Sequence, residues 1–129
     1  MIELFLQDLE PAFLAQSTFD VGYDFFVGFI NAEGGISTSA VVAKATEQSA
    51  PDRYCLPKER YDRLAYSNIP VLLLVANVKD NRLYHAWITP HESKDCANGT
   101  VSIPVIEIDA RSHQSIHQKL AQAKLPQQP

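Results

Sequence analysis

The chain has 129 residues, of which 46% are apolar and 20% are charged. This composition is that of an ordinary globular protein with one core, and it excludes a disordered chain, a collagen-like fibre and a disulfide miniprotein. The net charge of −4 at pH 7 argues against tight non-specific binding of nucleic acid, which needs Lys and Arg to neutralise phosphates. The longest apolar run, residues 69–76, has the length of a strand, so we expect no membrane-spanning helix.

The N-terminus indicates a cytoplasmic protein, and in that setting the cysteines are expected to be free. Glu3 and Asp8 lie in the first eight residues, and no basic stretch precedes an apolar one, so we expect no secretory signal peptide. The two cysteines, Cys55 and Cys96, are far apart in the sequence and form no CxxC pattern. We therefore expect two free thiols rather than a disulfide or a zinc site.

The first part of the chain predicts a helix followed by three strands. Residues 1–10 carry apolar side chains at helical spacing, and Pro11 ends the pattern. Segments rich in aromatic and β-branched residues predict strands at 13–19, 23–30 and 36–46. Residues 20–22 predict a turn between the first two strands. The sequence NAEGG at 31–35 predicts a tight turn, so the second and third strands should pair as a hairpin.

The second part predicts a helix, two strands and an appended strand and helix. Residues 47–55 are polar and predict a loop, after which Pro57 suits the first turn of a helix at 58–67. A nearly continuous run of Leu and Val at 71–78 predicts a strand buried on both faces. The remaining elements are a strand at 83–89, a polar loop at 91–100, a strand at 101–108 and a helix at 111–124. Pro104 places the strand 101–108 at a sheet edge.

These elements predict an α/β fold with a mixed central sheet flanked by helices. We expect one domain over residues 1–125 and a disordered tail over residues 126–129, where the sequence is Pro-Gln-Gln-Pro. Neither an internal repeat nor a low-complexity block interrupts this pattern.

Four segments resemble the PD-(D/E)xK nuclease-like superfamily, and more narrowly an uncharacterised bacterial branch described as a domain of unknown function. They are FDVGYD at 19–24, VVAKAT at 41–46, YDRLAYSNIPVLLL at 61–74 and YHAW at 84–87. The resemblance covers roughly residues 13–90. It implies a restriction-endonuclease-like core in the order helix, three strands, helix and strand (αβββαβ).

The resemblance also implies a site for Mg²⁺ or Mn²⁺. Asp24 corresponds to the metal-binding Asp of the superfamily, and Lys44 corresponds to the catalytic Lys that positions or activates the attacking water. The superfamily has an acidic residue or Gln two positions before that Lys, whereas this chain has Val42. Glu3 loosely matches a carboxylate that some members contribute from the first helix. Asp20 is a further candidate ligand, although its place in a turn favours a capping role.

Strand periodicity brings Asp24 and Lys44 together without reference to the family. Alternation along the second and third strands puts both side chains on one face, so they could meet across the hairpin. A Lys among Ala and Val is costly to desolvate unless it is paired or functional. Two structural alternatives stay open: an Asp24–Lys44 ion pair, and a Lys44 side chain that extends to the sheet edge.

The number of candidate metal ligands determines which function the sequence favours. Mg²⁺ commonly uses one or two carboxylates, and phosphodiester hydrolysis needs it to neutralise phosphoryl oxygens and to activate water. With Val42 in the motif, one carboxylate is certain, so we predict a nuclease-like domain with weakened or absent catalysis and weak nucleic-acid binding. One alternative is an active Mg²⁺ or Mn²⁺ nuclease. The other is a non-catalytic module whose strand edge or last helix joins a protein partner or a second copy.

Other candidate residues give weaker signals. His113 and His117 have the i,i+4 spacing of metal ligands, but they lack an HExxH pattern and lie among polar residues, which favours a solvated helix face. His85 and Trp87 lie two apart on a predicted strand and so share a face. A structural role is the favoured interpretation for both.

Overall fold

The computed structural model describes residues 1–17, 22–90, 94–96 and 99–122. The described part contains three helices and nine strands. In chain order they are α1 (Ile2–Asp8), β1 (Phe13–Gln16), β2 (Phe25–Ile30), β3 (Ile36–Thr46), β4 (Arg53–Pro57), α2 (Lys58–Ala65), β5 (Val71–Asn77), β6 (Arg82–Trp87), β7 (Lys94–Cys96), β8 (Thr100–Pro104), β9 (Ile106–Glu107) and α3 (Ala110–Gln122).

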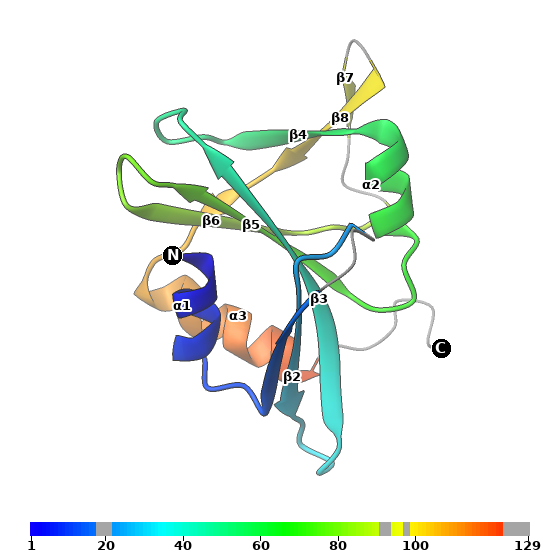
Figure 1. Ribbon diagram of the computed structural model, residues 1–129, viewed down its shortest axis with the longest axis vertical. Coiled ribbons are helices and arrows are strands. Elements are labelled where there is room, and N and C mark those ends of the chain that lie inside the picture. The colour runs from blue at the N-terminus through cyan, green and yellow to red at the C-terminus, as the bar shows by residue number, and fades with distance from the viewer. Residues whose placement is uncertain (18–21, 91–93, 97–98, 123–129) are drawn as a thin grey trace.

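The strands form two sheets. The larger has six strands in the order β1-β2-β3-β5-β6-β9, and the smaller has three in the order β4-β8-β7. Within the larger sheet, β3 and β5 are parallel and the other neighbours are antiparallel. Parallel strands need a crossover connection, which here consists of β4 and α2 and lies to one side of the large sheet (Figure 1). The predicted mixed α/β class with a central mixed sheet is therefore confirmed.

The predicted β2–β3 hairpin is also confirmed. Its register runs from Phe25 opposite Val41 to Ile30 opposite Ile36. At the turn, the Asn31 Oδ1 atom accepts hydrogen bonds from the amides of Glu33 and Gly35, both at 3.0 Å. Gly34 has φ +85°, a value that glycine adopts at little cost, so the turn depends on this residue.

Helices cover both faces of the large sheet. On one face, Phe25, Val27, Phe29, Val41, Leu72 and Leu74 pack against α1 and α3, which lie close together (Figure 1). On the other face, Ala40, Val42, Leu73, Val75 and Tyr84 pack against α2 and the small sheet. We call these the α1/α3 face and the α2 face. Every residue of β5 is buried, as the Leu/Val run predicts for a strand covered on both sides.

Several predictions after β3 are wrong in detail. The predicted loop 47–55 contains the first residues of β4, and the predicted loop 91–100 contains β7. The predicted strand 101–108 is two strands in different sheets, because the chain leaves the small sheet at Pro104 and then pairs with β6 through Ile106 and Glu107. Pro104 does not place β8 at an edge, since β8 is the central strand of the small sheet.

Two predicted segments fall wholly or partly outside the described residues, and the prediction on membrane-spanning helices is tested only for the described ones. Helix α3 is described as far as Gln122, and the predicted tail at 126–129 lies outside the described residues, as does most of the turn at 20–22. No described helix is both long and apolar enough to cross a membrane.

Candidate functional site

Asp24 lies directly before β2 and is bonded to the middle of β3. Its amide N donates to the carbonyl O of Val41 at 2.9 Å. Its Oδ2 atom accepts a hydrogen bond from the amide N of Ala43 at 2.7 Å. The β2–β3 ladder stops at this point. The Asp24 carboxylate therefore accepts the hydrogen bond from a β3 amide that a backbone carbonyl of β2 would otherwise accept.

Lys44 follows Ala43 on β3 and is half-buried. It pairs with Val75 of β5, and by alternation it shares the α2 face with Ala40 and Val42. Among the described residues, the ion pair that forms joins Arg82 and Glu107 rather than Asp24 and Lys44. Asp24 is thus bonded to the residue before Lys44, and of the two structural alternatives the Asp24–Lys44 ion pair does not form among the described residues.

Val42 lies two residues before Lys44, at the position where the resemblance would call for an acidic residue or Gln. Its side chain is 1% exposed and belongs to the core cluster that includes Leu73, Tyr61 and Leu64. The position two residues before Lys44 therefore contributes to packing beneath α2. Any carboxylate placed there would have to be accommodated inside this cluster.

The described structure does not place the two other predicted metal ligands, Glu3 and Asp20, beside Asp24. Glu3 is exposed in the first turn of α1, where a negative charge suits the helix dipole. Helix α1 packs on the α1/α3 face, opposite the face that Lys44 shares with Val42. Asp20 lies outside the described residues.

The described donors do not fit a tight Mg²⁺ or Mn²⁺ site on their own. Within the described ranges, no group of three or more His, Cys, Asp or Glu side chains could hold a metal ion. Beside Lys44 these ranges place one carboxylate, Asp24, and one of its oxygens is already bonded to Ala43. Divalent ions that keep several waters commonly use one or two carboxylates, so Asp24 alone supplies the least that such a site needs.

A hydroxyl contact fixes the end of α2 against the strand end that carries Asp24. The Tyr23 Oη and Ser67 Oγ atoms are 2.6 Å apart, and the Tyr23 ring meets Phe26 edge-on with 5.5 Å between centroids. The two residues of this contact are separated by 44 positions, so no local pattern in the sequence could have predicted it. The contact joins the residue before Asp24 to the segment that follows α2.

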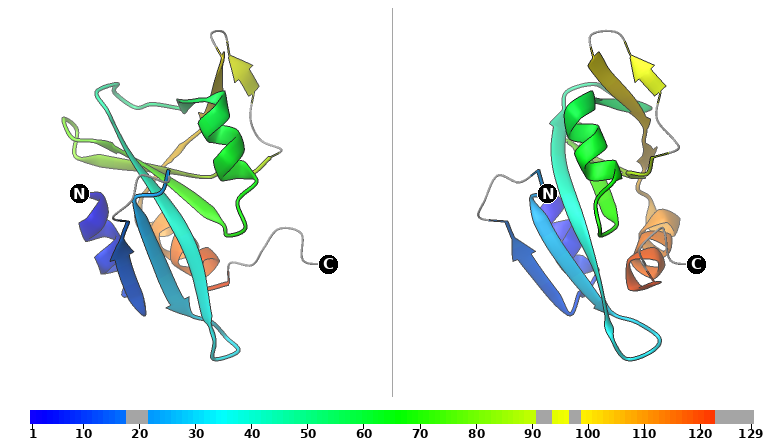
Figure 2. Two further views of the ribbon diagram at one scale, coloured as in Figure 1. Left: turned by 45° about the vertical axis from the view of Figure 1, so that its right-hand side comes forward. Right: turned by 90° about the vertical axis from the view of Figure 1, so that its right-hand side faces the viewer.

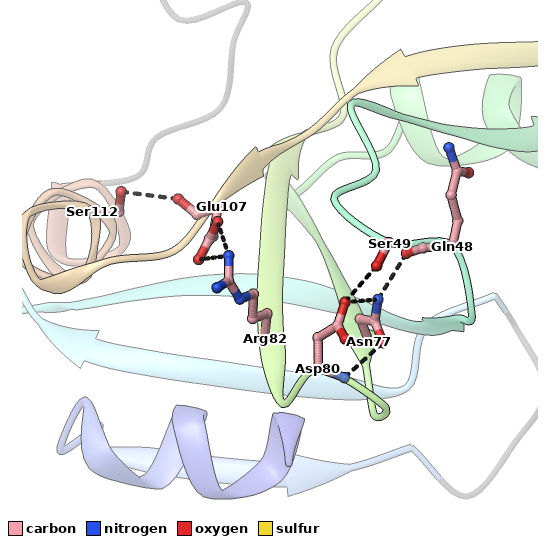
Figure 3. A network of polar contacts seen from close by, with 7 residues as sticks. All are labelled: Gln48, Ser49, Asn77, Asp80, Arg82, Glu107 and Ser112. Carbon is pink, nitrogen blue, oxygen red and sulfur yellow. Dashed lines mark hydrogen bonds and ion pairs between the residues drawn. The ribbon is translucent and has the colours of Figure 1, made fainter.

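A second unpredicted feature is a polar network at the far end of β3 and β5 (Figure 3). Asn77 is fully buried, and its Nδ2 atom donates to the Gln48 carbonyl at 2.8 Å and to Asp80 Oδ2 at 3.2 Å. Its Oδ1 atom accepts hydrogen bonds from the amides of Lys79 and Asp80, both at 3.1 Å. Ser49 Oγ donates to the same Asp80 oxygen at 2.9 Å. Asn77 thereby joins the segment after β3 to the β5–β6 turn.

His85 has the structural environment that the sequence favours. It lies on β6, and its Nδ1 atom is 3.1 Å from the carbonyl oxygen of Ile106. Burial lowers the pKa of His85, the hydrogen bond to Ile106 raises it, and the nearby Lys119 ammonium lowers it further, with a net decrease. Neutral His85 therefore donates from Nδ1 and fastens β9 to the large sheet.

The two histidines of α3 pack against separate aromatic rings. His113 meets Phe5 with 5.5 Å between ring centroids, and His117 meets Phe29 with 5.2 Å, both edge-on. His113 is half-buried, so the predicted solvated face describes His117 better than His113. The Lys119 Nζ atom lies 5.7 Å from the ring centroid of Trp87, a cation–π distance. These contacts join α3 to α1, β2 and β6.

In comparisons with known proteins, no family model, no curated protein and no solved structure matches this chain. The resemblance to the PD-(D/E)xK superfamily therefore depends on the residues of the chain itself.

Proposed function

We propose that the chain is a PD-(D/E)xK nuclease-like domain in which metal-dependent phosphodiester hydrolysis is weakened or lost. The observation that carries the proposal is the contact between Asp24 and Ala43, because it holds the candidate metal-binding Asp beside the residue that precedes Lys44. The order of α1, β1, β2, β3, α2 and β5 supports it too, with β4 as an addition before α2.

The burial of Val42 supports the loss of activity. In an intact site of this superfamily, the acidic residue at this position helps hold the metal that neutralises phosphoryl oxygens and activates water. Here the position carries an apolar side chain that is 1% exposed. Asp24 is left as the motif's carboxylate, and its bond to Ala43 reduces its capacity to bind a cation.

Lys44 retains a role that needs no metal. Lys44 is half-buried and forms no ion pair with a carboxylate among the described residues, so its charge is available to a phosphate oxygen. A single cation on a chain of net charge −4 gives only weak, salt-dependent attraction to a phosphodiester backbone. Weak nucleic-acid binding is therefore part of the proposal.

Binding of Mn²⁺ tests whether residue 42 is the missing ligand. Electron paramagnetic resonance titration would compare the parent with Val42→Glu and with Val42→Met, which fills similar space without a carboxylate. The proposal predicts that Val42→Glu binds Mn²⁺ about tenfold or more tightly than the parent and that Val42→Met does not. Adding Asp24→Asn should reverse the gain. Equal affinities in all folded variants would contradict the proposal.

A further inference from the structure

The β1 edge of the large sheet is open to another strand. β1 is the first strand in the sheet order, and β2 is its partner among the described strands. Figure 2 shows it as the outermost strand of the sheet, beside β2. Ala15 and Gln16 are exposed, and the Phe13 side chain is 38% exposed. The backbone amides and carbonyls of β1 that point away from β2 thus have no strand partner in the described part of the chain.

This edge lacks the protection found at the opposite edge. Residues 11–17, PAFLAQS, carry no charged side chain and no proline after Pro11. At the other edge, β9 pairs for only two residues, and Glu107 on it is bonded to Arg82 at 3.3 Å. Charged side chains and very short pairing are the usual devices that prevent edge-to-edge association. β1 is only four residues long and carries no charge, although its start is irregular: Ala12 N donates to the Gly28 carbonyl at 2.7 Å, while Phe13 is the residue opposite Gly28.

The hydrogen bonds to β2 determine which β1 amides point outward. Ser17 N donates to the Asp24 carbonyl at 2.9 Å, and Phe13 and Ala15 lie opposite Gly28 and Phe26 in the same register. Because the bonded pairs alternate along an antiparallel ladder, the amides of Phe13 and Ala15 point toward β2. The amides of Leu14 and Gln16 then point away from the sheet.

We propose that β1 pairs antiparallel with β1 of a second copy of this chain, about a two-fold axis at Leu14. The two Leu14 residues exchange backbone hydrogen bonds, and each Gln16 amide donates toward the start of the partner strand, which gives about four bonds in all. The proposal is independent of the nuclease-like site.

A second copy suits this edge better than an unrelated strand for two reasons. The uncharged segment 11–17 brings no like charges together when it meets itself. The register also places Phe13 opposite Ala15 of the second copy, so a large side chain faces a small one. The Phe13 ring already lies against Gly28, where an added Cβ would come within 2.1 Å of it, and this leaves the outer side of the ring for the second copy to cover.

The pairing is weak, because the strand has four residues and stable dimers bury about 1,200 Å² or more. Sedimentation equilibrium of the full chain from about 1 μM to about 1 mM would therefore detect it. Gln16→Pro removes one outward amide and leaves the bonds to β2 in place, as proline is tolerated on such an edge. Gln16→Ala is the matched control, since it changes the side chain and keeps the amide.

The proposal predicts that the parent and Gln16→Ala shift toward dimer mass at high concentration. Gln16→Pro should weaken the dimer by about tenfold or more at an unchanged unfolding temperature. Amide exchange of Leu14 and Gln16 should slow with concentration, while that of Ala15 should not. A parent that stays monomeric, or a dimer unaffected by Gln16→Pro, would overturn the proposal, and a concentration effect on Ala15 alone would overturn the register.

Discussion

The Asp24 carboxylate is bonded to the backbone of Ala43 and not to the ammonium group of Lys44, with 2.7 Å between Oδ2 and the amide N. The expectation that Asp24 and Lys44 could meet rests on strand alternation, which assumes that β2 continues regularly through Asp24. β2 begins at Phe25 instead, and both the amide and the carboxylate of Asp24 are used to finish its ladder with β3. The Asp thus has a structural role that any catalytic role has to share.

The first prediction concerns the end of the β2–β3 hydrogen-bond ladder at Asp24. Asp24→Ala should lower the free energy of unfolding by about 1 kcal/mol, because the Ala43 amide loses its acceptor. Asp24→Asn keeps an acceptor oxygen and should lose about half as much or less. Lys44→Met should change stability by less than about 0.5 kcal/mol, and urea unfolding of the double variant should show additive effects. Strong coupling between positions 24 and 44 would show that the two side chains interact after all.

The second prediction concerns Val42. A buried carboxylate without a partner is costly, so Val42→Glu in the metal-free protein should lose about 3 kcal/mol of unfolding free energy or more. Val42→Met, which stays apolar, should lose less than about 1.5 kcal/mol. Urea unfolding with and without Mn²⁺ measures both. Full stability of metal-free Val42→Glu would mean that residue 42 has access to solvent.

The third prediction concerns the Asn77 network. Asn77→Ala removes two donor and two acceptor contacts from a fully buried position, so it should cost about 2–3 kcal/mol. Ser49→Ala removes one exposed contact to Asp80 and should cost less than about 0.5 kcal/mol. Thermal unfolding compares the two. Equal small losses would show that the loop after β3 is held by other contacts.

The fourth prediction is a pH dependence that arises from His85. Its pKa in the folded chain lies below the usual 6.5, chiefly through burial, so protonation favours the unfolded chain. The stabilising contribution of neutral His85 is complete above about pH 6.5 and is lost as pH falls through the lower folded pKa. His85→Gln, whose amide can still donate to Ile106, should flatten the fall in stability between about pH 7 and about pH 5. If the free energy of unfolding falls with pH as steeply in His85→Gln as in the parent, other groups cause the pH dependence.

The sequence predicted best where hydrophobic patterning is strong and local. The third predicted strand, 36–46, coincides with β3, and the Leu/Val run coincides with the buried β5 within one residue. The hairpin between β2 and β3 follows from the NAEGG turn. In each case the local pattern of apolar side chains indicates a strand without information from distant residues.

The small sheet was not predicted because its strands carry little local signal. β4 and β7 are short, five and three residues, and in the small sheet β8 lies between them and pairs with both. Beyond Pro104 the chain stays bonded to the segment before β4, as Val105 N donates to the Asp52 carbonyl at 2.9 Å, and it then pairs with β6 through Ile106 and Glu107. The Asn77 network and the Tyr23–Ser67 contact likewise join distant segments, which a single sequence cannot reveal.

The most direct test of the nuclease-like proposal is cleavage of single- and double-stranded DNA and RNA with Mg²⁺ and Mn²⁺, with protein in excess. We expect no metal-dependent cleavage by the parent, and we expect cleavage by folded Val42→Glu that disappears when Asp24→Ala or Lys44→Ala is added. Val42→Met controls for a change in packing alone. Cleavage by the parent that requires Asp24 and Lys44 would contradict the account, because the site would then be active without a ligand at position 42.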